Sequence, residues 1–245
     1  MFLEVRGLTK SFGSEAVLED VNLAVASHET VSVLGRSGSG KTTLLKIIAG
    51  LQPADRGDLM LDGRRLDGVP PQERGVVYLY QEPLLFPHLD VWENVAFGLR
   101  LRGVRGSELE QRVAEMIASL ELEPHARKRP QQISGGQRQR VSFGRALIVQ
   151  PALLLLDEPF GNLDAETRAG MQALFKRVAA AFRITSLFVT HDLKEAILVG
   201  DRFAYLRAGR LRVFAGLEPF VEDPEIGVMA EVRFWESLVP AGKVT

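Results

Sequence analysis

A glycine-rich octapeptide follows directly after a short apolar, β-branched run near the start of the chain. It matches the pattern G-x-x-x-x-G-K-S/T and reads Gly35-Arg36-Ser37-Gly38-Ser39-Gly40-Lys41-Thr42. The run at 30–34 predicts a strand, and the residues at 43–49 predict a helix. A glycine-rich loop in this position favours phosphate binding, because backbone N–H groups can approach the anion without Cβ clashes and the helix N-terminus faces it.

The side chains that close this loop suit a nucleotide phosphate chain. In this pattern Lys41 reaches the β- and γ-phosphates, and the hydroxyl of Thr42 is a ligand for Mg²⁺. The alternative is a flexible loop without a ligand, since the pattern occurs by chance in about 1% of chains of this length. The position of the loop between a predicted strand and a predicted helix favours the phosphate site.

A second element of the same site is an apolar run that ends in two acidic residues. Leu153 to Leu156 is uniformly apolar, as expected of a strand buried on both faces, and Asp157 and Glu158 follow directly. Asp157 is then placed where it can hold Mg²⁺ through water, and Glu158 is suited to act as general base on the attacking water. An Asp-Glu pair at a strand end is common by itself, so its significance depends on the phosphate loop.

Strands and helices alternate over most of the chain. Predicted strands lie at 30–34, 58–62, 76–80, 152–156 and 184–189. The alternation favours an α/β fold with a largely parallel sheet. The interval from about 87 to 150 is predicted to be all-helical, and because it interrupts the alternation we interpret it as an inserted subdomain.

Two further amphipathic helices are predicted. In the first, over 107–123, Ser107 and Glu110 have the spacing of an N-terminal capping box. Its apolar face carries Leu109, Val113, Met116, Ile117 and Leu120. The second helix, over 165–182, has an apolar side made of Met171, Leu174, Phe175, Val178 and Phe182.

Composition excludes several classes of protein. The 245 residues carry a formal net charge of −1, so no global basic field recruits nucleic acid, and the absence of cysteine excludes disulfides and zinc–thiolate sites. No window approaches the roughly 18 apolar residues that a spanning helix needs. The N-terminus, 1–5, resembles a strand more than a signal peptide. We therefore expect a cytoplasmic chain without a nucleic-acid partner, in which the basic cluster at 127–129 is a solvated loop.

A third motif distinguishes between the families that use a phosphate loop. Ser134-Gly135-Gly136-Gln137 opens a predicted helix with bare backbone donors, and Gln137 has the spacing to close a capping box with Ser134. The alternative is merely a capped helix, but the motif stands shortly before Asp157 and Glu158. With Ile133 in front of it, the segment closely resembles the L-S-G-G-Q signature of the ATP-binding-cassette (ABC) ATPases.

The resemblance runs from about residue 2 to 215 and implies roles for further residues. Phe12 resembles the aromatic residue that stacks on adenine, and Gln81 resembles the glutamine that senses Mg²⁺ and the γ-phosphate. Residues 161–164 match the D-loop, although Ser or Ala is more usual at the position of Gly161. His191 matches the switch histidine that contacts the γ-phosphate. No role is assigned to His28, His88 or His125.

By this resemblance the expected site residues form three groups. The catalytic group is Lys41, Gln81, Glu158 and His191. The residues expected to contact ATP are Phe12, Gly35, Arg36, Ser37, Gly38, Ser39, Gly40, Lys41, Thr42, Thr43, Ser134, Gly135, Gly136, Gln137 and Asp164. The expected Mg²⁺ ligands are Thr42, Gln81 and Asp157.

The family has a P-loop NTPase core of the ABC type, with an antiparallel β subdomain and an inserted α-helical subdomain. For this chain the resemblance implies one domain over 1–245. Its core and β subdomain are expected at about 1–86 and 151–215, the helical subdomain at about 87–150, and a short tail at 216–245. ABC ATPases dimerise head to tail, so ATP would lie between the phosphate loop of one chain and the Ser134 helix of a second copy or a paralogous subunit.

The resemblance also implies an ATP hydrolase that drives a separate transmembrane permease from the cytoplasmic face of the inner membrane. The family binds a coupling helix of the permease near 83–95, and we expect 84–86 to contribute to that contact. This segment resembles the bacterial importers of polyamines, iron, sulfate, molybdate and sugars, which work with an extracytoplasmic solute-binding protein. The tail, which includes Phe234 and Trp235, is too short for the regulatory domain that many such importers carry. Nothing in the motor sequence indicates the solute.

Other nucleotide-binding families fit less well. A GTPase would need an N-K-x-D motif, which is not found, and neither a GTPase nor a kinase explains residues 134–137. ABC ATPases of DNA repair insert long coiled-coil arms before the signature, and the interval from Gln81 to Ser134 is too short for them and lacks heptads. An exporter or a non-transport ABC protein remains the alternative.

Overall fold

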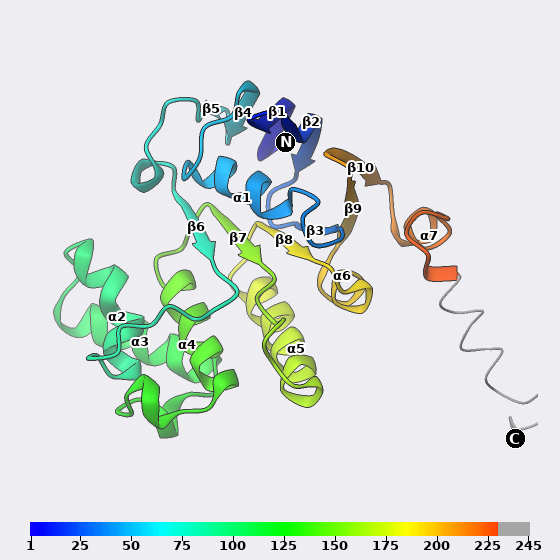
Figure 1. The fold of residues 1–245 in the computed structure, drawn as a ribbon. Coiled ribbons are helices and arrows are strands. Elements are labelled where there is room, and N and C mark those ends of the chain that lie inside the picture. The colour runs from blue at the N-terminus through cyan, green and yellow to red at the C-terminus, as the bar shows by residue number, and fades with distance from the viewer. Residues whose placement is uncertain (230–245) are drawn as a thin grey trace, which may run out of the picture.

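The computed structural model describes residues 1–229, in which helices cover two β-sheets (Figure 1). The strands are β1 (Leu3–Phe12), β2 (Glu15–Val25), β3 (Thr30–Leu34), β4 (Arg56–Leu61), β5 (Arg64–Arg65), β6 (Val76–Leu79), β7 (Leu153–Asp157), β8 (Ser186–Thr190), β9 (Arg202–Arg207) and β10 (Arg210–Phe214). The helices are α1 (Lys41–Ala49), α2 (Val91–Leu101), α3 (Gly106–Ser119), α4 (Gly135–Leu147), α5 (Ala165–Ala181), α6 (Leu193–Val199) and α7 (Leu217–Val221). Short 3-10 turns lie at Pro71–Glu73, Glu123–His125 and Pro130–Gln132.

The larger sheet has six strands in the order β10-β9-β3-β8-β7-β6. Neighbouring strands from β9 to β6 are parallel, and β10 pairs antiparallel with β9 at one edge. The smaller sheet is antiparallel and has the order β2-β1-β4-β5. The prediction of an α/β fold with a largely parallel core sheet and an antiparallel β part is confirmed.

The central strands are buried on both faces. All five residues of β3 and all five of β8 are buried, and so are the first four residues of β7. Continuous burial is the pattern of parallel strands that are covered by other elements on either side. The runs predicted as strands at 30–34, 152–156 and 184–189 therefore lie in the interior of the sheet.

Two hydrophobic cores lie on opposite faces of this sheet. One contains α1 and strands of the antiparallel sheet, and the other contains α5 and helices α2 to α4. Strand β7 belongs to both, because Leu153 and Leu155 lie in the first core while Leu154 and Leu156 lie in the second. The alternation follows from the two-residue period of a strand. It fixes the end of β7 relative to both layers.

The interval 87–150 is helical, as predicted. Helices α2, α3 and α4 gather beside the β6 edge of the larger sheet and pack on one another (Figure 1). The residues predicted to form the apolar face of α3 are buried, namely Leu109, Val113, Met116, Ile117 and Leu120. Helix α2 begins after Asp90, whose carboxylate accepts a hydrogen bond of 2.7 Å from the backbone N–H of Glu93.

The predicted ends of α3 are wrong. The expected capping box of Ser107 and Glu110 does not form, because the helix begins at Gly106 and Ser107 already lies within its first turn. Gly106 has a φ of 64°, so the chain enters the helix through a glycine in the left-handed region. At the other end the helix stops at Ser119 instead of residue 123, because Glu121 has a φ of 56°.

Helix α5 matches its prediction except at its C-terminus. Met171, Leu174, Phe175 and Val178 are buried as expected, but Phe182 is 39% exposed. The helix ends at Ala181 and the chain turns at Arg183, whose φ is 51°, before it enters β8. This turn leaves the ring of Phe182 at the surface, so its assignment to the buried side was wrong.

The chain after β10 returns to the larger sheet through one aromatic residue. Phe220 in α7 is fully buried, with its ring centroid 4.9 Å from that of Phe203 and 5.3 Å from that of Phe214. The predicted tail over 216–245 is described as far as residue 229, and Phe234 and Trp235 lie outside the described residues. Within residues 1–229, none of the helices has the length and apolar character needed to cross a bilayer.

Candidate functional site

The phosphate loop connects β3 to α1 and can be built only with glycine at critical positions. Gly38 and Gly40 have φ values of 79° and 103°, in the left-handed region that disfavours a Cβ atom. A Cβ atom on Gly35 would lie 2.6 Å from the carbonyl oxygen of Leu206, and one on Gly40 would lie 2.8 Å from that of Val17. The spacing of the motif therefore reflects close backbone approach around a turn that precedes a helix N-terminus.

Lys41 opens α1 with its side chain turned back into the loop. Its Nζ donates hydrogen bonds to the carbonyl oxygens of Gly35 (2.8 Å) and Arg36 (3.0 Å), and it lies 3.3 Å from Oε1 of Glu158. The side chain is only 4% exposed. The hydroxyl of Ser39, in the same loop, is buried and has no hydrogen-bond partner among the described residues. The loop thus contains a buried cation and a free hydroxyl, which suit an anion.

Asp157 ends β7 with both carboxylate oxygens in use. Thr42 donates to Oδ1 at 3.1 Å, and the hydroxyl of Tyr78 in β6 donates to Oδ2 at 2.6 Å. Burial raises the pKa of Tyr78, and the hydrogen bond to Asp157 raises it further, so the hydroxyl remains a proton donor. The sequence did not indicate Tyr78, because only the pairing of β6 with β7 brings it to Asp157.

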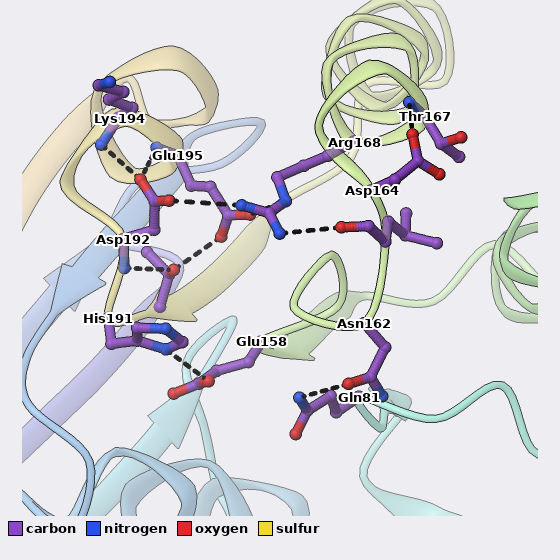
Figure 2. A network of polar contacts seen from close by, with 12 residues as sticks. Gln81, Glu158, Asn162, Asp164, Thr167, Arg168, His191, Asp192, Lys194 and Glu195 are labelled. Atoms are coloured by element: carbon purple, nitrogen blue, oxygen red, sulfur yellow. Dashed lines mark hydrogen bonds and ion pairs between the residues drawn. The ribbon is translucent and has the colours of Figure 1, made fainter. Parts of the chain in front are cut away.

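Glu158 follows in a left-handed backbone conformation, with a φ of 47°. Its backbone N–H donates to the carbonyl of Val189 at 3.0 Å, which ties it to the neighbouring strand β8. Its Oε2 lies 2.7 Å from Nδ1 of His191, the residue that follows β8 (Figure 2). The parallel pairing of β7 and β8 therefore brings the predicted base and the predicted switch histidine into contact.

One cavity of about 300 Å³ brings together about half of the predicted site residues. It is lined by Val17, Ser37, Gly38, Gly40, Lys41, Thr42, Thr43, Gln81, Asp157 and Glu158. Val17, on β2, is a lining residue that sequence reasoning missed, because nothing in its local pattern shows that β2 passes the loop. His191 lines a neighbouring cavity of about 570 Å³, together with Arg36 and Ser37.

Gln81 lies where the chain leaves β6 and reaches toward the predicted D-loop. Its Nε2 donates to Oδ1 of Asn162 at 3.3 Å (Figure 2). Gly161 leaves room for this contact, since a Cβ atom there would lie 2.9 Å from Nε2 of Gln81. Glycine therefore replaces the usual Ser or Ala at a position where a side chain would crowd Gln81.

The predicted signature helix is capped as expected, but it lies outside the cavity of the phosphate loop. Gln137 N donates to Ser134 Oγ at 3.2 Å, and Ser134 N donates to Gln137 Oε1 at 2.9 Å. His125 Nε2 contacts Gln137 Nε2 at 2.8 Å, a supporting contact that the sequence did not reveal. A Cβ atom on Gly136 would lie 2.5 Å from Cγ2 of Thr167 on α5, which explains a glycine there.

Phe12 and Asp164 are also absent from the lining of this cavity, as are Gly35, Arg36 and Ser39 of the loop itself. Phe12 lies next to the turn between β1 and β2, is 49% exposed, and has Lys10 Nζ 5.5 Å from its ring centroid. Asp164 is the N-cap of α5 and accepts a hydrogen bond of 3.0 Å from the backbone N–H of Thr167. That backbone hydrogen bond lowers the pKa of Asp164.

The chemistry of the cavity is defined by its charges. Lys41, the loop N–H groups and the N-terminus of α1 attract an anion, while Asp157 and Glu158 repel one. No group of three or more His, Asp or Glu side chains among the described residues could hold a metal ion alone. The hydroxyl of Thr42 and the carboxylate of Asp157 are hard oxygen ligands of the kind that Mg²⁺ takes together with phosphate oxygens.

A comparison with protein-family models matches residues 18–161 to the model described as "ABC transporter". The matched segment contains the phosphate loop, residues 134–137, and both Asp157 and Glu158. It makes up more than half of the chain. His191 and β8 to β10 lie beyond it.

Several similar proteins are ATP-binding proteins of import systems. A sulfate/thiosulfate import ATP-binding protein of Methylococcus capsulatus is 45% identical over 228 residues, which cover 91% of this chain and 66% of the relative. A spermidine/putrescine import ATP-binding protein of Haemophilus influenzae is 42% identical and covers 91% of this chain and 60% of the relative. An Fe(3+) ions import ATP-binding protein of Streptomyces avermitilis is 48% identical and covers 86% and 61%. The chain thus spans less than two thirds of the length of these relatives.

Solved structures show the same fold. A dimeric ATP-binding cassette in a post-hydrolysis state bound to ADP and Pi superposes with a TM-score of 0.75 at 32% sequence identity. The match covers 88% of this chain and 100% of that chain. A second dimeric structure, of a bacterial ABC transporter cassette, gives a TM-score of 0.74 at 33% identity.

Proposed function

This chain belongs to the ABC transporter family, and from that membership we propose that it is the ATP-binding and ATP-hydrolysing subunit of a solute importer. The observation that carries the proposal is the position of the Glu158 carboxylate at the edge of the phosphate-loop cavity. It lies 3.3 Å from Nζ of Lys41 and 2.7 Å from Nδ1 of His191. A base, a cation and an imidazole are gathered there around one point.

The loop at 35–42 is the proposed binding site for the β- and γ-phosphates of ATP. Lys41 supplies the positive charge, and the glycines supply backbone donors that no side chain obstructs. The close approaches around Gly35 and Gly40 support this role, since a Cβ atom at either position would collide with a backbone carbonyl and displace the loop. Arg36, Ser37, Ser39 and Thr43 belong to the same proposed site.

Mg²⁺ fits the oxygen donors at the end of β7. Thr42 and Asp157 lie in contact and Gln81 lines the same cavity, so we assign these three residues to the ion, Asp157 through water. When bound, the ion would neutralise charge on the phosphate oxygens. Tyr78 holds the Asp157 carboxylate in position by the hydrogen bond described above.

Glu158 is the proposed general base. Its carboxylate is 19% exposed, so a water molecule can reach it, and Nζ of Lys41 lies 3.3 Å away. His191 orients the carboxylate through Nδ1 and is the group we propose to contact the γ-phosphate. Gln81, which joins the cavity to the loop at 161–164 through Asn162, is the proposed sensor of the bound nucleotide.

We propose that two copies of this chain, or this chain and a paralogous subunit, complete each site. Phe12, Asp164 and residues 134–137 lie outside the cavity lining, so one protomer supplies only part of the expected contacts. The dimeric cassettes with the same fold support self-association, for which we propose a head-to-tail arrangement. In such a dimer the capped N-terminus of α4 would face the phosphates of the partner's ATP.

Coupling to a membrane permease is proposed for the helical side of the molecule. Leu84 is 55% exposed, and Phe86 packs on Phe97 with 4.5 Å between ring centroids. The exposed apolar side chain of Leu84 and the packing of Phe86 against Phe97 support the expected contact at 84–86. We propose that the chain binds there to the cytoplasmic side of a permease that works with an extracytoplasmic solute-binding protein. An exporter or a non-transport role is the alternative, which the import relatives disfavour.

The proposed division of the chain separates α2 to α4 from the strands and the other helices. Residues of about 1–86 and 151–215 would form the core and β subdomain, about 87–150 the helical signature subdomain, and 216–245 the tail. The concentration of α2 to α4 in one core supports the helical unit. The relatives act on sulfate, polyamines and iron, so they leave the solute open.

Glu158→Gln tests the function. The variant should lose measurable ATP hydrolysis while it still binds ATP, and size-exclusion chromatography with Mg-ATP should show a longer-lived dimer than the wild-type chain forms. Glu110→Gln, at an exposed position on α3, is the matched control and should hydrolyse ATP like wild type. Hydrolysis by Glu158→Gln at a near wild-type rate would remove Glu158 from the role of base.

A further inference from the structure

Arg168, in the first turn of α5, contacts two loops that belong to different parts of the site (Figure 2). Its Nη2 donates to the carbonyl oxygen of Leu163 at 2.9 Å, in the loop at 161–164. Its Nη1 lies 3.7 Å from Oδ2 of Asp192, and its Nε lies 3.8 Å from Oε1 of Glu195. One guanidinium thus joins the loop before α5 to the segment that follows His191.

The acidic partner of this cation is unusually buried for a charged residue. The Glu195 side chain is only 4% exposed, and that of Arg168 is 32% exposed. Burial raises the pKa of Glu195, and the hydrogen bond from Thr190 opposes that shift. An ionised carboxylate that is buried without a partner is energetically costly. Arg168 is the nearby cation, and its charge favours the ionised form of Glu195. The Nε atom of Arg168 is itself buried without a hydrogen-bond partner among the described residues.

The two carboxylates near Arg168 control the turn that carries His191. The hydroxyl of Thr190 donates to Oε2 of Glu195 at 2.7 Å and accepts from the backbone N–H of Asp192 at 3.0 Å. Asp192 in turn caps α6, because its carboxylate accepts from the backbone N–H of Glu195 at 3.1 Å. The residues on both sides of His191 are therefore tied to groups that face Arg168.

We propose that Arg168 is a positioning residue that couples the loop at 161–164 to His191, and so sets the contact between His191 and Glu158. The guanidinium is hydrogen-bonded to the loop and held to Asp192 and Glu195 only by charge, since 3.7 and 3.8 Å exceed hydrogen-bond length. A displacement of the loop would thus carry Arg168 toward or away from the two carboxylates. The catalytic consequence rests on the proposed function, but the coupling itself does not.

The same loop reaches the other side of the cavity. Asn162 accepts the hydrogen bond from Gln81, and Leu163 accepts the one from Arg168. The loop at 161–164 is therefore connected to Gln81 directly and to His191 through Arg168. In a head-to-tail dimer, a displacement of this loop would affect Gln81 and His191 at the same time.

Histidine NMR of the purified full-length chain tests the coupling without any nucleotide. The chain has 4 histidines, so the ring signals of His191 can be assigned by comparison with His191→Ala. Arg168→Gln should shift the His191 ring signals and Arg168→Lys should restore them in part. Arg177→Gln is the control, because Arg177 lies on the same helix and pairs with Glu121 at 2.7 Å instead. An unchanged His191 signal in folded Arg168→Gln would overturn the proposal.

Steady-state kinetics provide the second measurement. Arg168→Gln should lower kcat for ATP by about 10- to 100-fold, as expected when a group of the site is misplaced by about 1 Å. The KM for ATP should stay within about twofold, because Arg168 does not line the phosphate-loop cavity. If Arg168→Gln does not fold, Arg168→Lys carries the test through a smaller fall in kcat at unchanged thermal stability. A wild-type chain without ATPase activity would contradict the proposed function, whereas active wild type with unaffected Arg168 variants would contradict only the coupling.

Discussion

The Nδ1 atom of His191 lies 2.7 Å from Oε2 of Glu158, so two side chains 33 residues apart in sequence form one polar pair. They meet because β7 and β8 are parallel neighbours, which brings the residues after both strands to the same edge of the sheet. When Nδ1 donates its proton to the carboxylate, Nε2 remains available to a second group. The imidazole is therefore placed to act on both the base and a ligand in front of it.

His191→Ala should lower kcat for ATP hydrolysis by about 10²- to 10⁴-fold, the range for loss of a group that assists proton transfer. Nucleotide affinity should change little, because Lys41 and the loop glycines remain. Equilibrium binding of a fluorescent ATP analogue and steady-state hydrolysis, measured on the same preparation, check both statements. Full activity of the variant would show that the pair with Glu158 is only structural.

Tyr78→Phe should weaken Mg²⁺ binding and so raise the Mg²⁺ concentration that the enzyme needs for activity. The substitution removes the 2.6 Å hydrogen bond to Asp157 but keeps the ring, and the loss of a hydrogen bond to a metal ligand reduces metal affinity by about 10- to 100-fold. The Mg²⁺ concentration for half-maximal ATPase activity is the measurement. Tyr80→Phe is the control, since the Tyr80 ring lies beside Tyr78, with 4.6 Å between ring centroids, and the residue is 41% exposed. Equal Mg²⁺ curves for the two variants would rule out a role for the Tyr78 hydroxyl.

Two glycines on neighbouring helices should respond in opposite ways to alanine. Gly136→Ala places a Cβ atom 2.5 Å from Cγ2 of Thr167, so it should destabilise the contact between α4 and α5. Gly170→Ala, on α5, meets nothing within 4 Å and should stabilise the chain by about 0.5–1 kcal/mol through helix propensity. Urea unfolding gives both free energies. A stabilising Gly136→Ala would mean that α4 can shift away from α5 at no cost.

Leu84→Asp should prevent co-purification with the permease without affecting the fold. Leu84 is 55% exposed, so the charge is accommodated in the isolated chain, whereas it would be buried in the proposed contact. Phe86→Asp should also abolish assembly, but it removes the packing on Phe97 and should therefore lower stability as well. Affinity purification of the complex, with thermal unfolding of the isolated variants, separates the two effects. Unchanged assembly of Leu84→Asp would exclude 84–86 from the interface.

The elements that the sequence predicted well are those determined by nearby residues. The phosphate loop follows from its glycines, the strand before Asp157 from an unbroken apolar run, and the cap of α4 from Ser134 and Gln137 three residues apart. The same reasoning failed at Ser107 and Glu110, where a glycine in the left-handed region moved the start of the helix. Pattern alone does not show which of two adjacent residues enters the helix first.

Contacts between distant segments could not be predicted. Tyr78 reaches Asp157, 79 positions away, because β6 and β7 are neighbours in the sheet, and a single sequence does not give strand order. His125 supports Gln137 through a turn whose path is set by tertiary packing. Arg168 has the same property, since its partners lie in a loop and in a helix that meet only in the folded chain.

The alternation of β7 between two cores has a practical consequence for anyone who redesigns this protein. Because Leu154 is packed under one layer and Leu155 under the other, the strand offers no face on which volume can be changed independently. A substitution that changes the packing on either face of β7 would also move Asp157 and Glu158 at the end of the strand. Engineering of this chain should therefore leave β7 untouched and seek gains at exposed positions of α3, which lines neither cavity of the site.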